Sequence, residues 1–536
     1  MRSASFGERT LGSMRDRVAV LLCAEISRLG EGLDVPEILR WFRERDPAVC
    51  VHTLPDLCQN PEGLAKILVK EGATRVVLGL CGRRYEEGEV QVQVRKAGID
   101  PLGLEVVDLG GLCARAYPRP EATEKAKILL AGSVASARAF PGSSPANVKP
   151  YLLSRLSRRS FLRFPPLGYR AVPSVERERC VTEVGCALCV QACPYNALEV
   201  VDGEVKLEKS RCTSCGLCMT ACPLEAILFP GYTPGQVEAR VRAMLDPNTG
   251  NLQPRGILFT CSHGQETAGS WHPGWMPLFL PSLAMAPPVW FLAPLLMGAR
   301  AVGVLPCPGD CPQGHEEIIQ GRVRFCQELL ERVGAPAGLV QILPPLDRPP
   351  GGDGEPPREW GPWGDLDGSA FSPGPATMAR ILLRILEVSP PEKSVVLEHP
   401  FSPLGIVEIQ EDICTGCGMC GRTCPSRALV FEETEGQALL HFDPSLCTAC
   451  GQCLPVCPEG ERGAIRLRRG FDQKRLQEGK AVVYREAVAR CVACGAPIAP
   501  NRMLERVMAL LGSEDPSLQT VLTRYCTSCR SFQRAP

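Results

Sequence analysis

Apolar segments alternate with helix-period segments along the first part of the chain. The apolar segments are 18–24, 48–54 and 73–82, and between them 36–45 and 63–72 carry apolar residues every three or four positions. Strands that alternate with amphipathic helices are typical of a parallel sheet with crossover helices. We therefore predict an α/β domain that opens on a buried strand and reaches about residue 145.

The same alternation returns later in the chain and predicts a second parallel-sheet α/β domain. It comprises apolar segments at 255–261 and 300–307 and a helical pattern at 316–334. The uncharged run at 278–299 is long enough to cross a bilayer, but its prolines would interrupt a lone helix. We predict a buried strand and helix there.

Composition narrows the class of protein. Lys plus Arg equal Asp plus Glu at 59 each, so no basic field favours nucleic acid or an anionic membrane. The 29 cysteines fall mostly in C-x-x-C runs, which are typical of metal ligands in a reducing compartment. The N-terminal apolar stretch is too short for a secretory core, and the twin arginines at 157–163 precede no apolar helix. We expect a cytoplasmic protein without a membrane span.

Cysteines repeat with the spacing C-x2-C-x2-C-x3-C-P. Three of the cysteines in such a run curl around one 4Fe-4S cluster, and the fourth, before proline, ligates the other cluster of a two-cluster module. In a fourth, irregular copy, Glu183 stands where the first cysteine belongs and Cys180 lies three residues upstream. These segments resemble bacterial two-cluster ferredoxins, so we predict two ferredoxin modules with four 4Fe-4S clusters.

The crossover rule assigns each cluster its four ligands. The predicted sets are set A (Cys180, Cys186, Cys189 and Cys222), set B (Cys212, Cys215, Cys218 and Cys193), set C (Cys447, Cys450, Cys453 and Cys424) and set D (Cys414, Cys417, Cys420 and Cys457). Four structural zinc sites are the alternative, but zinc knuckles need neither a third cysteine nor the C-P ending. The G-x-G-x-x-G match at 416–421 lacks a strand-to-helix context, so we read it as accidental.

Four more cysteines lie at or just after predicted strand ends in the first α/β domain. They are Cys23, Cys58, Cys81 and Cys113, and strand carboxyl ends share one edge of a parallel sheet. This stretch resembles the N-terminal domain of the heterodisulfide reductase A polypeptide, which implies a fifth 4Fe-4S cluster. Four buried thiols that only pack are the alternative. We assign Cys50 to the core.

The second α/β domain resembles the delta subunit of methyl-viologen-reducing hydrogenase through LFTCSHG, MGARAVGVLPC and the segment 307–311. The resemblance implies a 2Fe-2S cluster and a link between a hydrogenase or formate dehydrogenase and heterodisulfide reductase. Gly264 and Ser282 replace cysteines of that pattern. The remaining ligands are Cys261, Cys307 and Cys311, with His315 or Cys326 as possible fourth ligands. A scaffold without metal is the alternative.

The tail carries two C-x-x-C arms around a helical stretch. Cys491, Cys494, Cys526 and Cys529 fit a tetrahedral four-cysteine site, for which structural zinc is the first choice and a rubredoxin-like iron the second. Two exposed redox pairs are the remaining option.

The predicted organisation is multidomain α/β plus ferredoxin-like α+β. Its parts are 1–145 (α/β), 165–235 (ferredoxin module 1), 236–345 (α/β), 346–396 (linker and short helix), 397–470 (ferredoxin module 2) and 471–536 (zinc-knuckle-like tail).

No catalytic residue and no FAD-binding βαβ unit stand out, so we expect an electron-transfer subunit of a heterodisulfide reductase-like or hydrogenase- or formate dehydrogenase-linked complex. Its partners would be flavin- or metal-containing oxidoreductase subunits, with soluble ferredoxin as a further candidate. The alternatives are a self-contained iron-sulfur oxidoreductase that acts on a disulfide or thiol, and a metal-dependent assembly scaffold.

Overall fold

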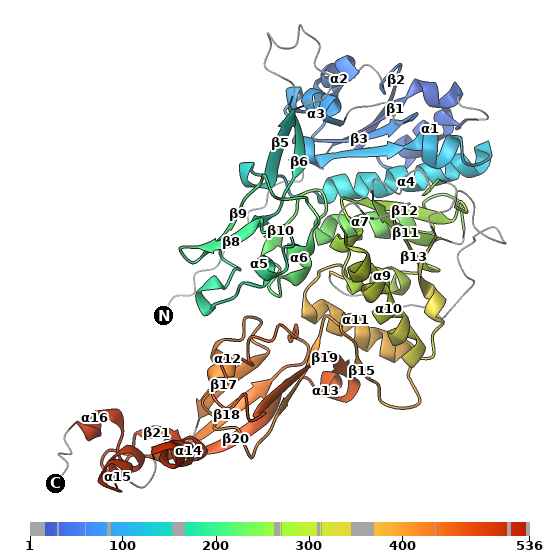
Figure 1. Cartoon of the computed structure of the whole chain (residues 1–536). Coiled ribbons are helices and arrows are strands. Elements are labelled where there is room, and N and C mark those ends of the chain that lie inside the picture. The colour runs from blue at the N-terminus through green and yellow to red at the C-terminus, as the bar shows by residue number, and fades with distance from the viewer. Residues whose placement is uncertain are drawn as a thin grey trace, which may run out of the picture.

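The computed structural model describes most of the chain as two stacked α/β domains, two ferredoxin modules and a tail (Figure 1). The described residues are 17–28, 32–58, 61–82, 87–152, 167–253, 255–261, 268–269, 271–307, 311, 314–344, 369–434, 436–511 and 516–531. The twin arginines at 157–163, Gly264 and most of the predicted linker lie outside them.

The first α/β domain is a four-stranded parallel sheet in the order β2-β1-β3-β4, as the sequence predicts. The central strand β1 is buried at all six residues, because helices cover the sheet. Asp34 caps α1 by accepting from the Glu37 N–H at 3.0 Å, which fixes where that helix begins. The elements are β1 Val18–Cys23, α1 Val35–Arg45, β2 Val49–Leu54, α2 Leu64–Glu71, β3 Arg75–Leu80, α3 Glu87–Lys96, β4 Leu104–Asp108, η4 Gly110–Ala114 and α4 Arg119–Ala139.

The second α/β domain is also a parallel sheet, in the order β12-β11-β13-β14. Its central strand β11 is buried at every residue. The elements are α7 Pro234–Leu245, β11 Gly256–Cys261, β12 Trp275–Leu280, η9 Leu283–Met285, α9 Pro288–Leu296, β13 Val302–Leu305, α10 Glu316–Arg332 and β14 Val340–Ile342.

The uncharged run at 278–299 divides into the end of β12 and the helix α9, which confirms the predicted buried strand and helix. All nine residues of α9 are buried, Pro294 among them. Among the described residues, no helix is long and apolar enough to cross a membrane.

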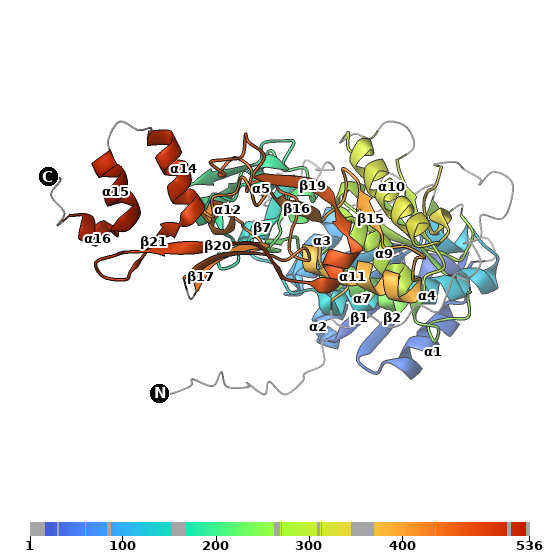
Figure 2. The same ribbon diagram turned by 90° about the horizontal axis from the view of Figure 1, so that it is seen from below.

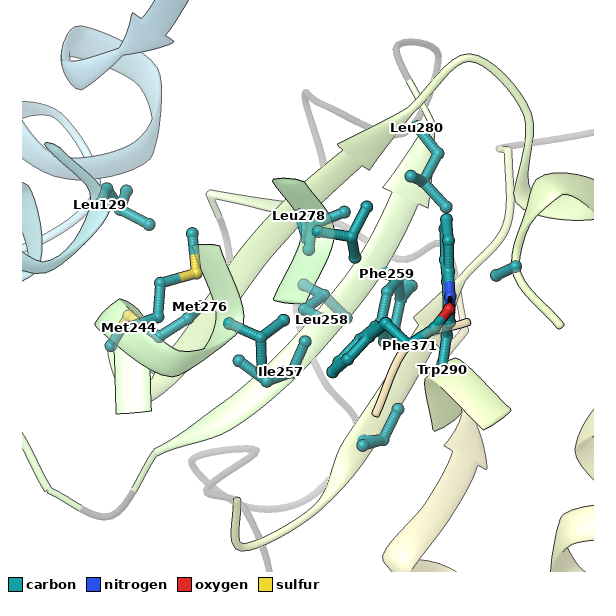
Figure 3. Packing of buried hydrophobic residues seen from close by; sticks show 14 of the residues in the cluster. Leu129, Met244, Ile257, Leu258, Phe259, Met276, Leu278, Leu280, Trp290 and Phe371 are labelled. Carbon is teal, nitrogen blue, oxygen red and sulfur yellow. Dashed lines mark hydrogen bonds between the residues drawn. The ribbon is translucent and has the colours of Figure 1, made fainter. Parts of the chain in front are cut away.

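The two sheets share one hydrophobic core, with α4 and α7 packed between them (Figure 1). The helices approach closely where Gly132 faces Met244, since a Cβ on Gly132 would lie 2.9 Å from the methionine Cγ. Leu129 of α4 and Met276 of β12 extend this contact (Figure 3). The α/β domains are therefore one packed body.

Both ferredoxin modules pair one antiparallel hairpin with a second two-stranded ladder. In module 1 the pairs are β8 with β9 and β7 with β10, and in module 2 they are β17 with β18 and β16 with β19. A hairpin of β5 and β6 joins module 1 to the first domain. The bounds are β5 Val148–Leu152, β6 Leu167–Ala171, β7 Ser174–Val175, α5 Leu188–Gln191, β8 Leu198–Val201, β9 Glu204–Leu207, α6 Leu217–Ala221, β10 Ile227–Leu228, β15 Val396–Glu398, β16 Gly405–Ile409, α12 Met419–Arg422, β17 Leu429–Thr434, β18 Gln437–Phe442, β19 Ile465–Asp472 and α13 Gln473–Glu478.

The tail grows out of module 2, because its strand β20 pairs with β18 and extends the hairpin sheet. The tail points away from the α/β body (Figure 2). Its elements are β20 Ala481–Arg490, β21 Pro497–Pro500, α14 Asn501–Leu511, α15 Pro516–Arg524 and α16 Thr527–Arg530.

The end of the predicted linker belongs to the core of the second α/β domain. Phe371 has no exposed surface, and its carbonyl accepts from the Trp290 indole N–H at 2.6 Å (Figure 3). Helix α11, Pro375–Val388, follows and buries its apolar side, including Ile381 and Leu382. The proline-rich segment therefore ends before Phe371.

Replacing Phe371 with alanine is expected to destabilise the α/β body by about 3–5 kcal/mol, because a buried aromatic ring leaves a cavity. Chemical unfolding followed by tryptophan fluorescence measures the change. Leu510→Ala is the control, since Leu510 is 67% exposed and should stay within about 0.5 kcal/mol. An equal effect of the two substitutions would contradict the packing described for Phe371.

Candidate metal centres

Local backbone geometry shapes the cysteine loops of both modules. Gly216, Gly416 and Gly418 have positive φ, which lets each loop turn tightly between consecutive cysteines. The residue three positions after each C-P cysteine also has positive φ, at Asn196, Glu225 and Arg427. These conformations repeat in both modules, as expected when one motif builds several sites.

The left-handed residue after a C-P cysteine turns a backbone N–H toward the sulfur. Ala197 N donates to Cys193 Sγ at 3.3 Å, and Ala226 N donates to Cys222 Sγ at the same distance. In module 2, Leu429 N donates to Cys424 Sγ at 3.5 Å. N–H groups directed at sulfur stabilise a thiolate and tune the potential of a bound cluster.

Three cavities coincide with three of the predicted ligand sets. The first has a volume of about 420 Å³ and is lined by all of set D, the second of about 340 Å³ by all of set B, and the third of about 320 Å³ by all of set C. In each cavity the fourth thiol comes from the other cysteine run of the same module. The structure thus brings these sets together with the crossover that the spacing predicts.

Set A comes together although its first run is irregular. After burial, the charges of Cys222 and Cys180 raise the pKa of Cys189 to about 12. Burial, followed by the same two thiols, also raises the pKa of Cys186. The 3₁₀ turn Thr182–Val184 spans the longer spacing and contains Glu183, the residue that replaces the missing cysteine.

The lining of these cavities suits an iron-sulfur cluster. Burial raises the pKa of Cys420, Cys447 and Cys453 to about 12, so these thiols are protonated and inert until a metal displaces the proton. Gly405 leaves open space beside Cys447, since a Cβ there would lie 2.8 Å from the sulfur. Apolar walls such as Phe431 and Leu467 line the remaining surface.

The four sets also neighbour one another. Cys189 of set A acts on the pKa of Cys218 in set B, and Cys453 of set C acts on that of Cys420 in set D. Between the modules, Cys450 of set C acts on the pKa of Cys186 in set A. Electrostatic contacts therefore connect the sets in the order B, A, C and D.

The edge of the first α/β sheet gathers three of its four predicted thiols. Cys23, Cys58 and Cys81 hold their sulfurs within 4.8 Å of one another, and the Cys58–Cys81 separation is 2.9 Å. Hydrogen bonding with Cys58 lowers the pKa of Cys23 to about 5. The carboxyl ends of β1 and β3 converge here, as predicted from the parallel sheet.

Cys113 stands outside that group of three. It lies in η4, has no exposed surface, and burial raises its pKa to about 12 with Lys125 as a neighbouring charge. The turn nevertheless packs on the Cys81 loop, where a Cβ on Gly110 would lie 1.9 Å from the Cys81 carbonyl oxygen. Cys50, assigned to the core, is half-buried on β2.

The edge of the second sheet carries Cys261, Cys307 and Cys311. The Cys261 and Cys307 sulfurs are 3.2 Å apart, and burial, followed by Cys261 and Cys311, raises the pKa of Cys307 to about 12. Ser282 caps η9 by accepting from Ala284 N at 3.3 Å. Gly264 lies outside the described residues.

The two candidate fourth ligands differ in their surroundings. Cys326 is buried within α10, and its thiol donates to the Pro288 carbonyl at 3.8 Å. His315 precedes α10, is 3% exposed, and its Nε2 has no hydrogen-bond partner in the structure. Its ring packs edge-on against Tyr195 of module 1, on whose pKa Cys311 and Cys215 both act.

The tail brings all four of its predicted thiols together. The sulfurs of Cys491, Cys494, Cys526 and Cys529 lie within 4.8 Å of one another, with 3.6 Å between Cys494 and Cys526. A tetrahedral ion with Zn–S bonds of about 2.3 Å requires roughly 3.8 Å between sulfurs. Backbone N–H groups, that of Cys526 first, lower the pKa of Cys491 to about 6, which favours the thiolate. This geometry fits a single metal ion.

Sequence patterns did not identify the charged and aromatic neighbours of set B. Tyr195, Lys149 and Arg322 come from three separate parts of the chain. A positive charge at an inward position of α10 is a weak signal for Arg322, since Val323, Phe325 and Cys326 beside it are buried. No spacing links it to the cysteines.

Comparison with known families defines the class of the two modules. Residues 172–226 and 413–461 each match the 4Fe-4S dicluster domain. The chain therefore carries two dicluster iron-sulfur modules, which confirms the predicted ferredoxin resemblance.

Among curated proteins, the chain is similar to the iron-sulfur A polypeptide of CoB–CoM heterodisulfide reductase from Methanocaldococcus jannaschii, with 30% identity over 129 residues, 23% of this chain and 20% of that protein. It is 33% identical over 126 residues to the first such polypeptide of Methanopyrus kandleri, covering 23% of this chain and 19% of that protein. A heterodisulfide reductase A-like protein of Archaeoglobus profundus shows 32% identity over 126 residues, covering 23% and 18% respectively. The chain spans about a fifth of the length of these relatives.

Proposed function

We propose that this chain is an iron-sulfur electron-transfer subunit of a heterodisulfide reductase-like complex, or of one linked to a hydrogenase or formate dehydrogenase. The carrying observation is the succession of thiol sets B, A, C and D, three of which line their own cavities. A row of neighbouring sites suits conduction along the molecule.

In this proposal, sets A to D hold four 4Fe-4S clusters, each of which supplies one-electron chemistry at a tunable potential. The cysteines supply the thiolates, the backbone N–H groups stabilise their charge, and apolar walls exclude water. The thiols of the first sheet edge are candidates for a fifth cluster, Cys261, Cys307 and Cys311 for a 2Fe-2S cluster, and the tail thiols for zinc.

The two ends of the row suit different partners. Set B lies beside the α/β body, where Tyr195 and Cys311 meet. Set D lies beside the tail, since Arg502 of α14 acts on the pKa of Cys414. We propose that a flavin- or metal-containing oxidoreductase binds at one end and an acceptor such as soluble ferredoxin at the other. The six-part division of the chain is part of this proposal.

Metal analysis of protein purified without oxygen tests the proposal. About sixteen irons with equal sulfide are expected from sets A to D, rising to about twenty with the first sheet edge and about twenty-two with the 2Fe-2S site. The protein should also be bleached by reduced methyl viologen and recolour with oxidised ferredoxin. Zinc with almost no iron would overturn the proposal, and steady turnover of a disulfide by the isolated chain would favour a self-contained oxidoreductase.

A further inference from the structure

A guanidinium from the second α/β domain reaches the side of set B. Arg322 on α10 donates to the carbonyls of Ala284 at 2.6 Å and Ala286 at 2.9 Å, and to Thr220 Oγ1 at 3.0 Å. Thr220 lies in α6 between Cys218 and Cys222. All three acceptors are uncharged, and within the described part of the chain the charges that act on this guanidinium belong to cysteines and not to carboxylates. Arg322 therefore keeps an uncompensated positive charge beside the ligands.

The environment of Arg322 leaves that charge effective. Burial lowers its pKa to about 10, so it remains protonated at neutral pH, and the same charge interacts with Cys215. A second cation, Lys149, donates to the carbonyls of Ser210 and Cys212 at 3.1 Å each. Lys149 opposes the effect of burial on the pKa of Cys212. Two cations thus approach set B from different sides.

Set D has charged neighbours too, but they are paired. Arg502, which acts on Cys414, lies 3.4 Å from Glu486 and 3.6 Å from Asp412. Glu459, which acts on Cys457, lies 2.8 Å from Arg506 and 2.6 Å from Arg462. These opposite charges largely cancel at the cavity.

Sets A and C have no comparable cation. The charges that act on Cys186 and Cys189 of set A, and on Cys447 and Cys453 of set C, are those of other cysteines. Across the described residues, an uncompensated cation beside the ligands is thus a property of set B.

Reduction adds one negative charge to a cluster, and a fixed cation in a low-dielectric environment stabilises the reduced state more than the oxidised state. We propose that Arg322, assisted by Lys149, gives a 4Fe-4S cluster at set B the highest reduction potential of the four ferredoxin clusters. Electrons in the chain then rest at the junction of module 1 with the second α/β domain, beside Tyr195 and Cys311. Arg322 is a positioning residue for charge, and the inference rests on the proposed function.

A redox titration followed by electron paramagnetic resonance tests this assignment on the full chain with its clusters. In Arg322→Gln, the first cluster signal to appear on reduction should need a more reducing solution. We expect at least a tenfold lower ratio of reduced to oxidised cluster at a fixed ambient potential, or about 59 mV for one electron. Arg324→Gln is the control, because Arg324 is exposed on the same helix. Arg322→Lys keeps the charge and should titrate close to the unaltered protein.

The outcomes separate this inference from the proposed function. Protein without clusters would defeat the proposed function itself. Full iron content with an unmoved first signal in Arg322→Gln would overturn the inference alone, as would a shift confined to a later signal. If Arg322→Gln loses iron, Lys149→Gln and Arg322→Lys decide: an unchanged titration in the first together with a tenfold or larger shift in the second would overturn the inference.

Discussion

Replacing Cys417 and Cys457 together with alanine is expected to remove about four irons per chain, no more than Cys417→Ala alone. Both thiols line one cavity with Cys414 and Cys420, although they come from different cysteine runs. Once one ligand is lost, losing a second from the same site costs no further cluster. Iron and sulfide analysis of protein purified without oxygen measures the loss.

The matched control pairs Cys417→Ala with Cys424→Ala. These cysteines stand in the same run but line different cavities, so the double variant should lose about eight irons. If each run instead held its own cluster, the two double variants would exchange their results. Loss of about eight irons from Cys417→Ala alone would contradict the separate cavity of set C, whose walls include Val407, Leu429 and Leu467.

The sequence predicts the ligand sets because they depend on local geometry. Consecutive cysteines three residues apart lie on one tight loop, and the turn after each C-P cysteine is fixed by one left-handed residue such as Asn196 or Arg427. The irregular set A follows for the same reason, since one 3₁₀ turn absorbs the extra residues after Cys180.

The parallel sheets were predictable because burial makes their strands apolar throughout. β1 and β11 are buried at every residue, and their last residues, Cys23 and Cys261, therefore mark the carboxyl edges. The convergence of Cys23, Cys58 and Cys81 follows from this topology. Cys113 stands apart because it follows the edge strand β4 and turns into η4, a detail that strand order does not determine.

Contacts between distant segments escape prediction from the sequence. The pairing of β20 with β18, the burial of Phe371 against Trp290, and the approach of Arg322 to Thr220 each join parts of the chain separated by more than forty residues. None carries a spacing or a period of its own. The charge around set B, on which its potential depends, is therefore a property of the tertiary structure.

Removing the metal from the tail is expected to unfold α14 to α16 while β20 stays ordered. Helix α14 has no buried residue, and among the described tail residues after β20 burial is confined to Cys491, Pro500 and Cys526. Structural zinc contributes roughly 10–16 kcal/mol of apparent binding free energy in small zinc domains, so its loss exceeds what this tail can replace. β20 retains its ladder with β18.

Hydrogen exchange with and without a zinc chelator, under conditions that leave the iron content unchanged, measures this effect. Protection should disappear over residues 501–530 and persist over 481–490. Cys529→Ala should reproduce the loss without chelator, whereas Cys50→Ala, a cysteine outside every thiol set, should leave the tail protected. The contacts of Arg502 with Asp412 and Glu486 cannot hold α14 alone, since surface ion pairs contribute about 0–1 kcal/mol each. Full protection of α14 after metal removal would contradict a structural role for the four-cysteine site.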